Sequence, residues 1–496
     1  MKIPTLKYDL IFLLLVSFYT IIASSLLLFE PRIWPDEAYL ADIAGNILGY
    51  GRMGTDLWGT IIFGAQNHFF WYPPLYLLSL AGFFKAFGIS IFNQRIFTVL
   101  IGEAFLFIYY LFGKSITAKY KPWIGNFIVF SSIVLLIVDP IFQRGARIGR
   151  SEILVLFFIT LGLLLFGSVF NKTNPKKKLI YFLAGLSIGL ASITHLIASI
   201  FFIAIVAIIL IQGRSKILTK PNVYLFLGFI APLILWIVSI SPNYYPFLKQ
   251  LSLQRHYHKL VISHIEAVYK HGSVNEQLTY TIYIILTLLT LSWSLIKKNL
   301  NYLLLIFILI LSWSICILGK LEWYSIYFLP FLYLLSTIIS YNLIRSKKWF
   351  QKLVGISILI AFAYLVAVNI KTYVQSYKTY AAHKQDYEYV GREITSIIPQ
   401  GKSVYLSSIP DFYFVLRNKY TLYQFPPLPP KVNEYLDLLN KTDYVVINIH
   451  LEAMYVGGLL ARYVDLNKAS EYTVGSSALY QARVIELIPR NKRYKP

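Results

Sequence analysis

The stretch FEPRIWPDEAYLADIAGNILGYG, residues 29–51, follows an apolar run at residues 9–29 and places Asp36 and Glu37 side by side. An apolar run of about 20 residues can cross a bilayer as a helix and is longer than the apolar part of a signal peptide. We therefore expect a retained first membrane span. Asp and Glu account for only 23 of the 496 residues, so a pair of acids where a span ends indicates a polar site at the membrane surface.

The composition extends this interpretation to the whole chain. The sequence is 57% hydrophobic and 14% charged, whereas soluble proteins are about 25% charged, which indicates a polytopic α-helical membrane protein. The formal net charge of +23 does not indicate nucleic acid. Its basic residues lie in short clusters between apolar runs, as membrane topology requires, and not on one soluble face. The single cysteine, Cys316, excludes a disulfide within the chain.

Ten apolar runs are suited to spanning helices. They cover residues 9–29, 95–113, 122–140, 152–170, 179–212, 222–240, 278–296, 300–318, 323–343 and 351–370. The run at 179–212 is too long for one span and has basic residues at both ends. We therefore expect a helical hairpin that turns near SITHLIAS, residues 192–199, which brings the total to about eleven spans.

The basic clusters predict the orientation of these spans. Clusters such as NKTNPKKK (171–178) and RSKKWFQK (345–352) contain no acid, and the positive-inside rule places them in the cytoplasm together with the N-terminus. Residues 72–88, YPPLYLLSLAGFFKAFG, resemble a further span, but counting it would reverse every later loop. We therefore expect a re-entrant or juxtamembrane helix on the outer side. The expected location is the inner (plasma) membrane, crossed several times.

The composition changes near residue 373. EYVGREITSIIPQGKSVYLSS reads as an amphipathic helix, a turn and a strand, EYLDLLNKTDYVVINIH as a helix and a strand, and SALYQARVIELIP as a last strand. These patterns predict a transmembrane domain at 1–372 and a small α/β domain at 373–496. Eleven spans from a cytoplasmic N-terminus place this second domain on the extracytoplasmic side of the membrane.

Asp36 and Glu37 are the first candidate site residues. They could simply begin a helix, with Asp36 as the N-cap, because acids are favoured at a helix N-terminus. Alternatively, a carboxylate at the outer rim of the membrane is partly desolvated, which raises its pKa toward that of a useful general base. A helix start would explain only one of the two acids.

A second candidate group lies in DPIFQRGARIGRSEIL, residues 139–154. Arg144, Arg147 and Arg150 recur every third residue and would share one face of a helix, and Glu152 opens the next span. These arginines could contact lipid headgroups. However, three arginines on the outer side oppose the positive-inside bias, so we expect them to bind an anion, most naturally a phosphate, through their planar bidentate side chains.

Other polar residues lie in the outer connections. Lys320 could bind an anion or extend to the membrane surface. His68 could touch a substrate or lie on the surface, and His195, on the turn of the hairpin, could face the same site or cap a helix. The histidines of the loop at 241–277 (His256, His258, His264 and His271) could hold zinc, but carboxylates and cysteines are sparse nearby, and a solvated loop is the far more common arrangement. Glu103 lies within a span, where a carboxylate normally has a partner in the bundle.

At this point the sequence resembles the GT-C glycosyltransferases, in particular the branch with protein O-mannosyltransferases and the lipid A aminoarabinose transferase. Five features carry the resemblance, in family order over most of residues 1–345: PDEAY (35–39), YPPLYLLSLAGFFKAFG (72–88), ARIGRSEILVLFF (146–158), THL (194–196) and YSIYFLPFLYLL (324–335). Tyr72, a substrate-binding candidate, stands where the aminoarabinose branch has a lysine, and this departure weakens the case for lipid A as the acceptor.

The resemblance implies a sugar donor on a polyprenyl phosphate, transfer on the outer face of the membrane, and inversion at the anomeric carbon. It also implies that Asp36 is the base and that Glu152 supports the site. The residues fit this chemistry, because a sugar phosphodiester already contains a good leaving group. The reaction then needs a base for the acceptor hydroxyl and cations for the departing phosphate; Arg144, Arg147, Arg150 and Lys320 are the candidate cations.

Some questions stay open at this stage. The scheme requires no cofactor, although Asp36, Glu37 and Glu152 could hold a divalent cation. The expected partners are the lipid-linked donor and membrane lipids, without nucleic acid, and the acceptor could be a protein, a lipid or a glycan. The alternative function is a membrane transporter or glycolipid flippase without transferase activity, which would predict internal repeats and interrupted helices at mid-membrane.

Overall fold

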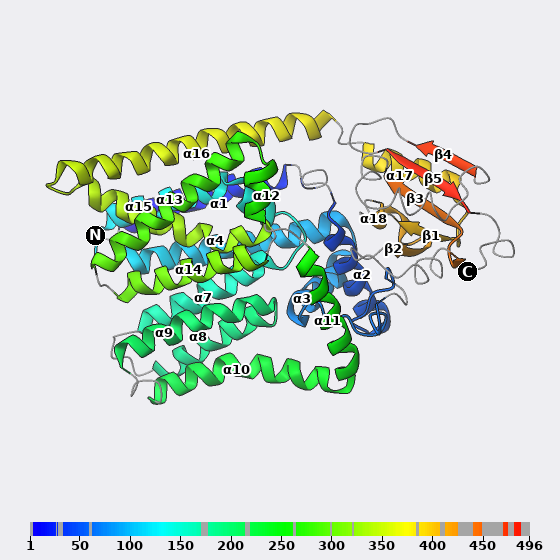
Figure 1. The fold of residues 1–496 in the computed structure, drawn as a ribbon, viewed down its shortest axis with the longest axis horizontal. Helices are drawn as coiled ribbons and strands as arrows, with labels where there is room; N and C mark the ends of the chain where they lie inside the picture. Colours follow the sequence, from blue (N-terminus) through cyan, green and yellow to red (C-terminus); the bar gives the residue numbers. More distant parts are fainter. Residues whose placement is uncertain are drawn as a thin grey trace.

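The computed structural model describes residues 3–25, 27, 33–58, 62–169, 177–213, 219–260, 264–297, 300–319, 322–382, 386–406, 412–424, 440–448, 470–474 and 481–487. Helices dominate these residues, and a small sheet lies at the C-terminal end (Figure 1).

Helices occupy all of the predicted apolar runs. They are α1 (Ile3–Ser24), α4 (Ile91–Thr117), α5 (Pro122–Val138), α7 (Glu152–Val169), α8 (Lys177–Ser192), α9 (Ile200–Gln212), α10 (Lys220–Ile240), α13 (Val274–Lys297), α14 (Leu300–Gly319), α15 (Leu329–Ile344) and α16 (Trp349–Ala382). Among the described residues, 5 helices are long and apolar enough to cross a membrane, and several shorter apolar helices accompany them. The membrane-helical fold is therefore confirmed, whereas the number of spans stays a prediction.

The predicted hairpin at 179–212 is interrupted where the sequence suggested. Helix α8 ends at Ser192, a short 3-10 helix η1 covers Leu196–Ser199, and α9 begins at Ile200. The break places His195 at the end of the bundle that lies nearest to the C-terminal sheet.

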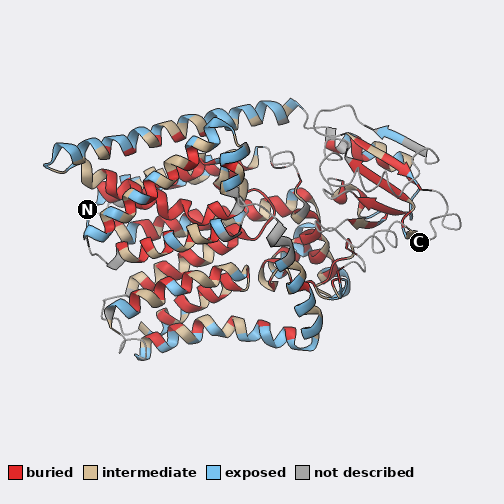
Figure 2. Cartoon of the chain, in the orientation of Figure 1, coloured by how far each residue is buried: buried red, intermediate tan, exposed pale blue. Residues whose placement is uncertain are grey.

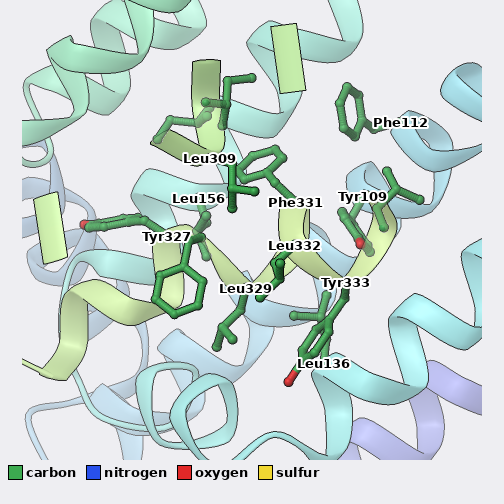
Figure 3. Close-up of a cluster of buried hydrophobic side chains, with 14 of the residues drawn as sticks. Tyr109, Phe112, Leu136, Leu156, Leu309, Tyr327, Leu329, Phe331, Leu332 and Tyr333 are labelled. Atoms are coloured by element: carbon green, nitrogen blue, oxygen red, sulfur yellow. The ribbon is translucent and has the colours of Figure 1, made fainter. Parts of the chain in front are cut away.

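Large apolar and aromatic side chains fill the centre of the bundle. Buried residues line the helix surfaces that face one another, whereas α10 and α16 expose long apolar faces at its two flanks (Figure 2). Helix α15 is buried along most of its length, and its Phe331 and Tyr333 lie among side chains from α4 and α5 (Figure 3). The hydroxyl of Tyr109 on α4 donates to the carbonyl of Pro330 at 2.7 Å.

Several shorter helices accompany the bundle, namely α2 (Pro35–Tyr50), α3 (Pro74–Phe87), α6 (Pro140–Gly145), η3 (Ser241–Asn243), α11 (Tyr244–Leu260), α12 (His264–His271) and η4 (Glu322–Tyr327). Helices α2 and α3 lie between the bundle and the sheet (Figure 1), whereas α6, α12 and η4 pack against helices of the bundle. Helix α3 is the short helix expected at residues 72–88, and its buried side chains pack with those of α2. This position agrees with a helix that lies outside the bundle (Figure 1).

The C-terminal region contains α17 (Asp386–Ile397), α18 (Tyr413–Leu416) and a five-stranded sheet. Its strands are β1 (Ser403–Leu406), β2 (Thr421–Gln424), β3 (Tyr444–Asn448), β4 (Ser470–Val474) and β5 (Ala482–Glu486), in the order β2-β1-β3-β5-β4. Strands β2, β1 and β3 are parallel, whereas β5 is antiparallel to both β3 and β4. The predicted helix α17 and strands β1, β3 and β5 are confirmed; β2 and β4 were not predicted.

The buried apolar residues form two main cores. One lies within the bundle. The other joins α2, α3 and the connection at residues 51–73, which we call the first outer loop, to α17, α18 and the sheet. The expected boundary at residue 372 falls inside α16, which continues to Ala382.

Candidate active site

Helix α2 begins at the end of the bundle that faces the C-terminal sheet (Figure 1), and its first turn carries both candidate acids. Trp34 is the N-cap, and the fixed φ of Pro35 suits the first helical position. The Glu37 carboxylate accepts a hydrogen bond from the backbone N–H of Trp34 at 2.8 Å. The alternative in which Asp36 is the N-cap is therefore wrong, because Glu37 makes the capping contact and leaves the Asp36 side chain for other partners.

Glu37 lies in a fully enclosed ion pair with Arg95 of α4. The exposed fraction of both side chains is 0%, and the Arg95 Nη2–Glu37 Oε2 distance is 2.7 Å. Arg95 Nε donates to Glu37 Oε1, also at 2.7 Å, which makes the pair bidentate. The backbone N–H of Gly149 donates to the same Oε1 at 2.9 Å. Glu37 thus fastens α2 to α4 and to the loop that carries Arg150.

Gly149 is needed for this close approach. A Cβ atom there would lie 2.3 Å from Cγ of Gln94, which no side chain could tolerate. Instead, Gln94 Nε2 donates to the carbonyl of Gly149 at 2.9 Å. Both the backbone N–H and the carbonyl of Gly149 are therefore hydrogen-bonded, which fixes the loop before α7.

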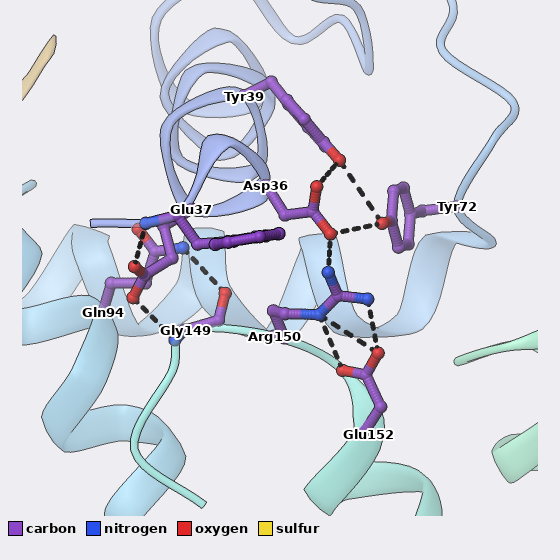
Figure 4. A network of polar contacts seen from close by, with 9 residues as sticks. Asp36, Glu37, Tyr39, Tyr72, Gln94, Gly149, Arg150 and Glu152 are labelled. Atoms are coloured by element: carbon purple, nitrogen blue, oxygen red, sulfur yellow. Dashed lines mark hydrogen bonds and ion pairs between the residues drawn. The ribbon is translucent and has the colours of Figure 1, made fainter. Parts of the chain in front are cut away.

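Asp36 and Glu152 meet on one guanidinium group (Figure 4). Arg150 forms an ion pair with Oδ2 of Asp36 through Nη1 and with Oε1 of Glu152 through Nη2, the latter at 2.6 Å. The exposed fractions of the side chains are 13% for Asp36, 5% for Arg150 and 2% for Glu152. Acids from two separate connections thus come together, and Asp36 is the more accessible of the two.

Two tyrosines complete the surroundings of Asp36. The hydroxyl of Tyr72 donates to Oδ2 of Asp36 at 3.0 Å, and the hydroxyl of Tyr39 donates to Oδ1. Tyr39 lies one helical turn after Asp36 on α2, whereas Tyr72 arrives from the end of the first outer loop. The carboxylate of Asp36 is therefore oriented by three donors, one of which is cationic.

His195 and Tyr324 lie beside this group. The His195 ring has its centroid 6.4 Å from that of Tyr72 and 5.8 Å from that of Tyr324. His195 also caps η1, since its Nδ1 accepts from the N–H of Ile197 at 3.4 Å. The capping alternative is therefore confirmed, whereas the role of His195 in the site stays a prediction. Burial, followed by the charge of Glu152, raises the pKa of Tyr324 to about 12, which keeps this hydroxyl protonated at neutral pH.

The three arginines do not share one helical face, and that prediction is wrong. Helix α6 ends at Gly145, so Arg147 and Arg150 lie in the following loop, whose path is set by the contacts of Gly149. Arg144 lies over the ring of Trp34, and Arg147 lies over that of Tyr373, both at 5.9 Å. In the described contacts, only Arg150 reaches the carboxylates of Asp36 and Glu152.

Asp139 stabilises the start of helix α6, which precedes this loop. Its carboxylate accepts from the N–H groups of Ile141 at 2.8 Å and Phe142 at 3.2 Å, and so caps α6. The hydroxyls of Tyr283 on α13 and Tyr333 on α15 both donate to its other oxygen at 2.6 Å. The corner between α5 and α6 is thereby tied to two further helices of the bundle.

The remaining candidates are placed elsewhere or lie outside the described residues. The His68 ring stacks on Phe70 at 5.7 Å, and its carbonyl accepts from Gln250 of α11; burial lowers its pKa. None of its described contacts is with Asp36 or Arg150. Lys320 lies outside the described residues, as do the side chains of His256, His258, His264 and His271. Glu103 has a partner in Thr20 of α1, whose hydroxyl donates to it at 2.6 Å.

The sequence reasoning did not anticipate Arg95 or Tyr39. Arg95 carried a usable signal, because a charged residue near the start of an apolar run normally has a partner inside the bundle. Tyr39 carried a weaker signal, since it lies three residues after Asp36 on a predicted helix and so on the same face.

The comparisons with known proteins agree with this architecture. ArnT from Cupriavidus metallidurans, solved bound to undecaprenyl phosphate, has a TM-score of 0.62 at 12% identity, covering 97% of this chain and 98% of that chain. The oligosaccharyltransferase of Archaeoglobus fulgidus, solved with Zn and sulfate, has a TM-score of 0.54 at 12% identity, covering 88% and 68% of the two chains. The same archaeal enzyme, AglB, was also solved with an inhibitory peptide and a dolichol-phosphate.

The sequence comparisons are sparser. No protein-family model matches the chain. An uncharacterized protein of Aquifex aeolicus (strain VF5) is 29% identical over 164 residues, which is 33% of this chain and 30% of that protein. At 12% identity the structural likeness shows the fold, which extends over nearly the whole length of ArnT. The chain therefore has the fold of the GT-C glycosyltransferases, as the resemblance in its sequence implied.

Proposed function

We propose that this protein is a membrane glycosyltransferase that moves a sugar from a polyprenyl-phosphate carrier to an acceptor hydroxyl on the outer face of the membrane, with inversion. The convergence of Asp36, Arg150 and Glu152 at one end of the helices is the observation that carries this proposal. A fold shared with a protein solved bound to undecaprenyl phosphate supports the donor class.

In this scheme Asp36 is the general base. Its carboxylate accepts the proton of the acceptor hydroxyl, and the acceptor oxygen forms a bond to the anomeric carbon. The bond from that carbon to the phosphate oxygen breaks at the same time, and the phosphate leaves with the electron pair. Asp36 suits the role because it is reachable from outside while Tyr39 and Tyr72 fix its orientation.

Arg150 must exchange partners during the reaction. In the described arrangement it is shared by Asp36 and Glu152, and a carboxylate that is paired with a cation is a weak base. A phosphate offers the guanidinium a bidentate partner of matching geometry. When Arg150 turns to the donor phosphate, it stabilises the leaving group and frees Asp36 to take a proton. Glu152 then keeps Arg150 in place.

The other sequence candidates take supporting roles. Glu37 has no exposed surface, so we assign it to positioning α2 and not to contact with substrate. Tyr72 and His195 lie close enough to Asp36 to touch the sugar or the acceptor. Arg144, Arg147, His68 and Lys320 are proposed to contribute positive or hydrogen-bonding groups along the route of the lipid phosphate.

A divalent cation is not needed for these steps. Asp36 and Glu152 offer carboxylate oxygens, which Mg²⁺ and Mn²⁺ prefer. Among the described residues, however, no three His, Cys, Asp or Glu side chains are grouped to hold an ion. The archaeal oligosaccharyltransferase, which shares the fold, was solved with Zn and sulfate, so a divalent cation stays a proposed ligand of these two carboxylates. In the proposed orientation the protein lies in the inner membrane, with its N-terminus on the cytoplasmic side and its C-terminal sheet on the extracytoplasmic side.

The proposal is tested with Asp36→Asn, which keeps the size of the side chain and removes the base. The matched control is Asp56→Asn, in the loop that follows α2, where the side chain is 42% exposed and pairs with Arg52. Glycans and glycolipids of cells that carry each variant are compared by mass spectrometry, and binding of undecaprenyl phosphate to each purified protein is measured.

We expect Asp36→Asn to reduce the transferred product at least about 100-fold, the usual contribution of a general base, with undecaprenyl phosphate still bound. Asp56→Asn should behave like the natural protein. Full transfer by Asp36→Asn would overturn the assignment of the base. Identical glycans in cells with and without the protein would overturn the transferase itself and favour a flippase.

A further inference from the structure

Asp42 lies six residues after Asp36 on α2, and its two carboxylate oxygens serve two different parts of the chain. Oδ2 accepts from the hydroxyl of Thr55 at 2.8 Å and from the N–H of Asp56 at 2.7 Å, both in the first outer loop. Oδ1 accepts from the hydroxyl of Tyr413 on α18 at 3.1 Å. A single side chain thus joins the base-bearing helix, the first outer loop and the C-terminal region.

Further contacts join the same parts. The N–H of Gln424, at the end of β2, donates to the carbonyl of Leu57 at 2.6 Å. Gly45 lies one turn after Asp42, and a Cβ there would come within 2.9 Å of Nη2 of Arg417, so glycine permits the close approach. The apolar side chains around these contacts form one continuous core from both sides.

This junction leads directly to the base. Trp58, which follows Leu57 and is fully buried, has its ring centroid 4.9 Å from that of Tyr39. Tyr39 in turn donates to Asp36. The C-terminal region therefore reaches the hydroxyl that orients the base through two packed aromatic rings, as well as through α2 itself.

We propose that Asp42 is a positioning residue for the transfer reaction, and that the C-terminal region is a structural part of the catalytic unit. The expected effect on sugar transfer rests on the proposed function, whereas the junction between Tyr413 and Asp42 does not. Docking of Tyr413 on Asp42 holds the first outer loop against α2, and this keeps Tyr39 and Asp36 in register. Burial, and then the charge of Asp42, raise the pKa of Tyr413 well above its ordinary value, so its hydroxyl stays a donor.

The test uses Tyr413→Phe in the full-length protein in lipid nanodiscs. Its matched control is Tyr420→Phe, which also removes one tyrosine hydroxyl of the C-terminal region, but one that donates at 2.7 Å to Ile398 within that region. Hydrogen–deuterium exchange is followed in peptides that cover residues 36–50 and 53–58. Binding of undecaprenyl phosphate and the amount of glycan product in cells are measured alongside.

We expect exchange of these two peptides to rise about fivefold in Tyr413→Phe, the effect of one lost hydrogen bond, and to stay unchanged in Tyr420→Phe. Product should fall in Tyr413→Phe while its affinity for undecaprenyl phosphate is kept. Asp42→Ala should raise exchange further, and Asp42→Asn, which still offers an acceptor oxygen, should restore most of the protection.

Equal exchange in Tyr413→Phe and Tyr420→Phe would overturn the inference, as would faster exchange in Tyr413→Phe that is confined to the C-terminal peptides. The exchange result does not depend on transfer. If Asp36→Asn leaves the product intact while Tyr413→Phe still loosens α2, the proposed function fails and the junction stands.

Discussion

Helix α2 carries three acids in three different surroundings. Glu37 has no exposed surface and is paired with an equally buried Arg95. Asp36, one residue earlier, is 13% exposed and shares Arg150 with Glu152. Asp42 is held by neutral hydroxyl and N–H donors from two parts of the chain. The comparison shows that the partner and the exposure of a carboxylate, more than its place in a motif, set its role.

The difference between Asp36 and Glu37 separates chemistry from structure. A base must meet the hydroxyl whose proton it takes, and only Asp36 combines an exposed edge with a cation that a phosphate could draw away. Glu37 is already fully hydrogen-bonded, and removing it would leave the charge of Arg95 buried without a counter-ion. Substitutions at the two positions should therefore fail for different reasons.

The largest expected effect follows Glu37→Gln. Breaking a buried ion pair on one side costs about 3–5 kcal/mol, so this variant should melt at a much lower temperature in detergent and lose product because it is poorly folded. Glu266→Gln is the control, because Glu266 pairs with Lys270 at the surface, where the side chains are 44% and 59% exposed. An unchanged melting temperature for Glu37→Gln would contradict the structural role of Glu37.

The next effect is expected for Arg150→Lys, which keeps the charge and removes the planar fork. Losing a charged hydrogen bond of about 1.5–3 kcal/mol should lower transfer about 10- to 100-fold, with little change in the melting temperature. Arg52→Lys, at an exposed ion pair with Asp56, should leave transfer unchanged. Product levels and undecaprenyl phosphate affinity are the measurements, and full activity would show that Arg150 does not act on the phosphate.

A smaller effect is expected for Tyr72→Phe. The variant removes one neutral donor to Asp36, worth about 0.5–1.5 kcal/mol, so transfer should change only about 2- to 10-fold. The hydrogen bond from Tyr72 favours the charged form of Asp36, so removing it should raise the pKa of Asp36. The acidic limb of the pH–rate profile should therefore move to higher pH. Tyr389→Phe, which removes a surface hydroxyl bonded to Glu393, serves as control. If the acidic limb does not move, the hydroxyl of Tyr72 does not influence the protonation of Asp36 during the reaction.

The smallest effect concerns Asp42 and pH. Burial, more than the nearby Asp56, raises the pKa of Asp42 above its ordinary value, against the effect of its hydrogen bond from Thr55. The folded state therefore binds this proton more tightly than the unfolded chain. The resulting stability is complete below about pH 4 and is lost as the pH rises through the raised pKa.

The check compares melting temperatures of the natural protein and Asp42→Asn between pH 4 and 8. The natural protein should lose stability relative to the variant as the pH rises, because only the natural side chain must become charged at this half-buried position. Tyr413, whose pKa lies far above this range, does not contribute. A constant difference across the range would mean that Asp42 is charged throughout.

Much of the architecture could be predicted from local patterns. Apolar runs near the length of a span predicted the helices, and the break near Thr194 followed from a run too long for one span. The pairing of charges across the fold could not be predicted in this way. Glu37 and Arg95 lie 58 residues apart, and no periodicity relates them.

Other errors have local causes. The spacing of Arg144, Arg147 and Arg150 suggested one helix, but tertiary contacts of Gly149 end the helical path before the second arginine. Strands β2 and β4, with 4 and 5 residues, are similar in length to the predicted β1, β3 and β5, but their sequences TLYQ and SEYTV are less apolar than YVVIN and ARVIE and carry a weaker strand signal. The docking of Tyr413 on Asp42 joins residues 371 positions apart, which a single sequence does not reveal.

Helix α16 leads from the bundle to the C-terminal region and is unusually long. Its 34 residues extend about 51 Å at 1.5 Å per residue, whereas the hydrocarbon layer is about 30 Å thick. Helix α16 is thus about 20 Å longer than one crossing requires, and the sheet that follows it is also joined to α2 and to Leu57 by the hydrogen bonds of Tyr413 and Gln424. Inserting one helical turn into α16 should therefore strain these hydrogen bonds, because the helix and the junction with α2 together determine where the sheet lies.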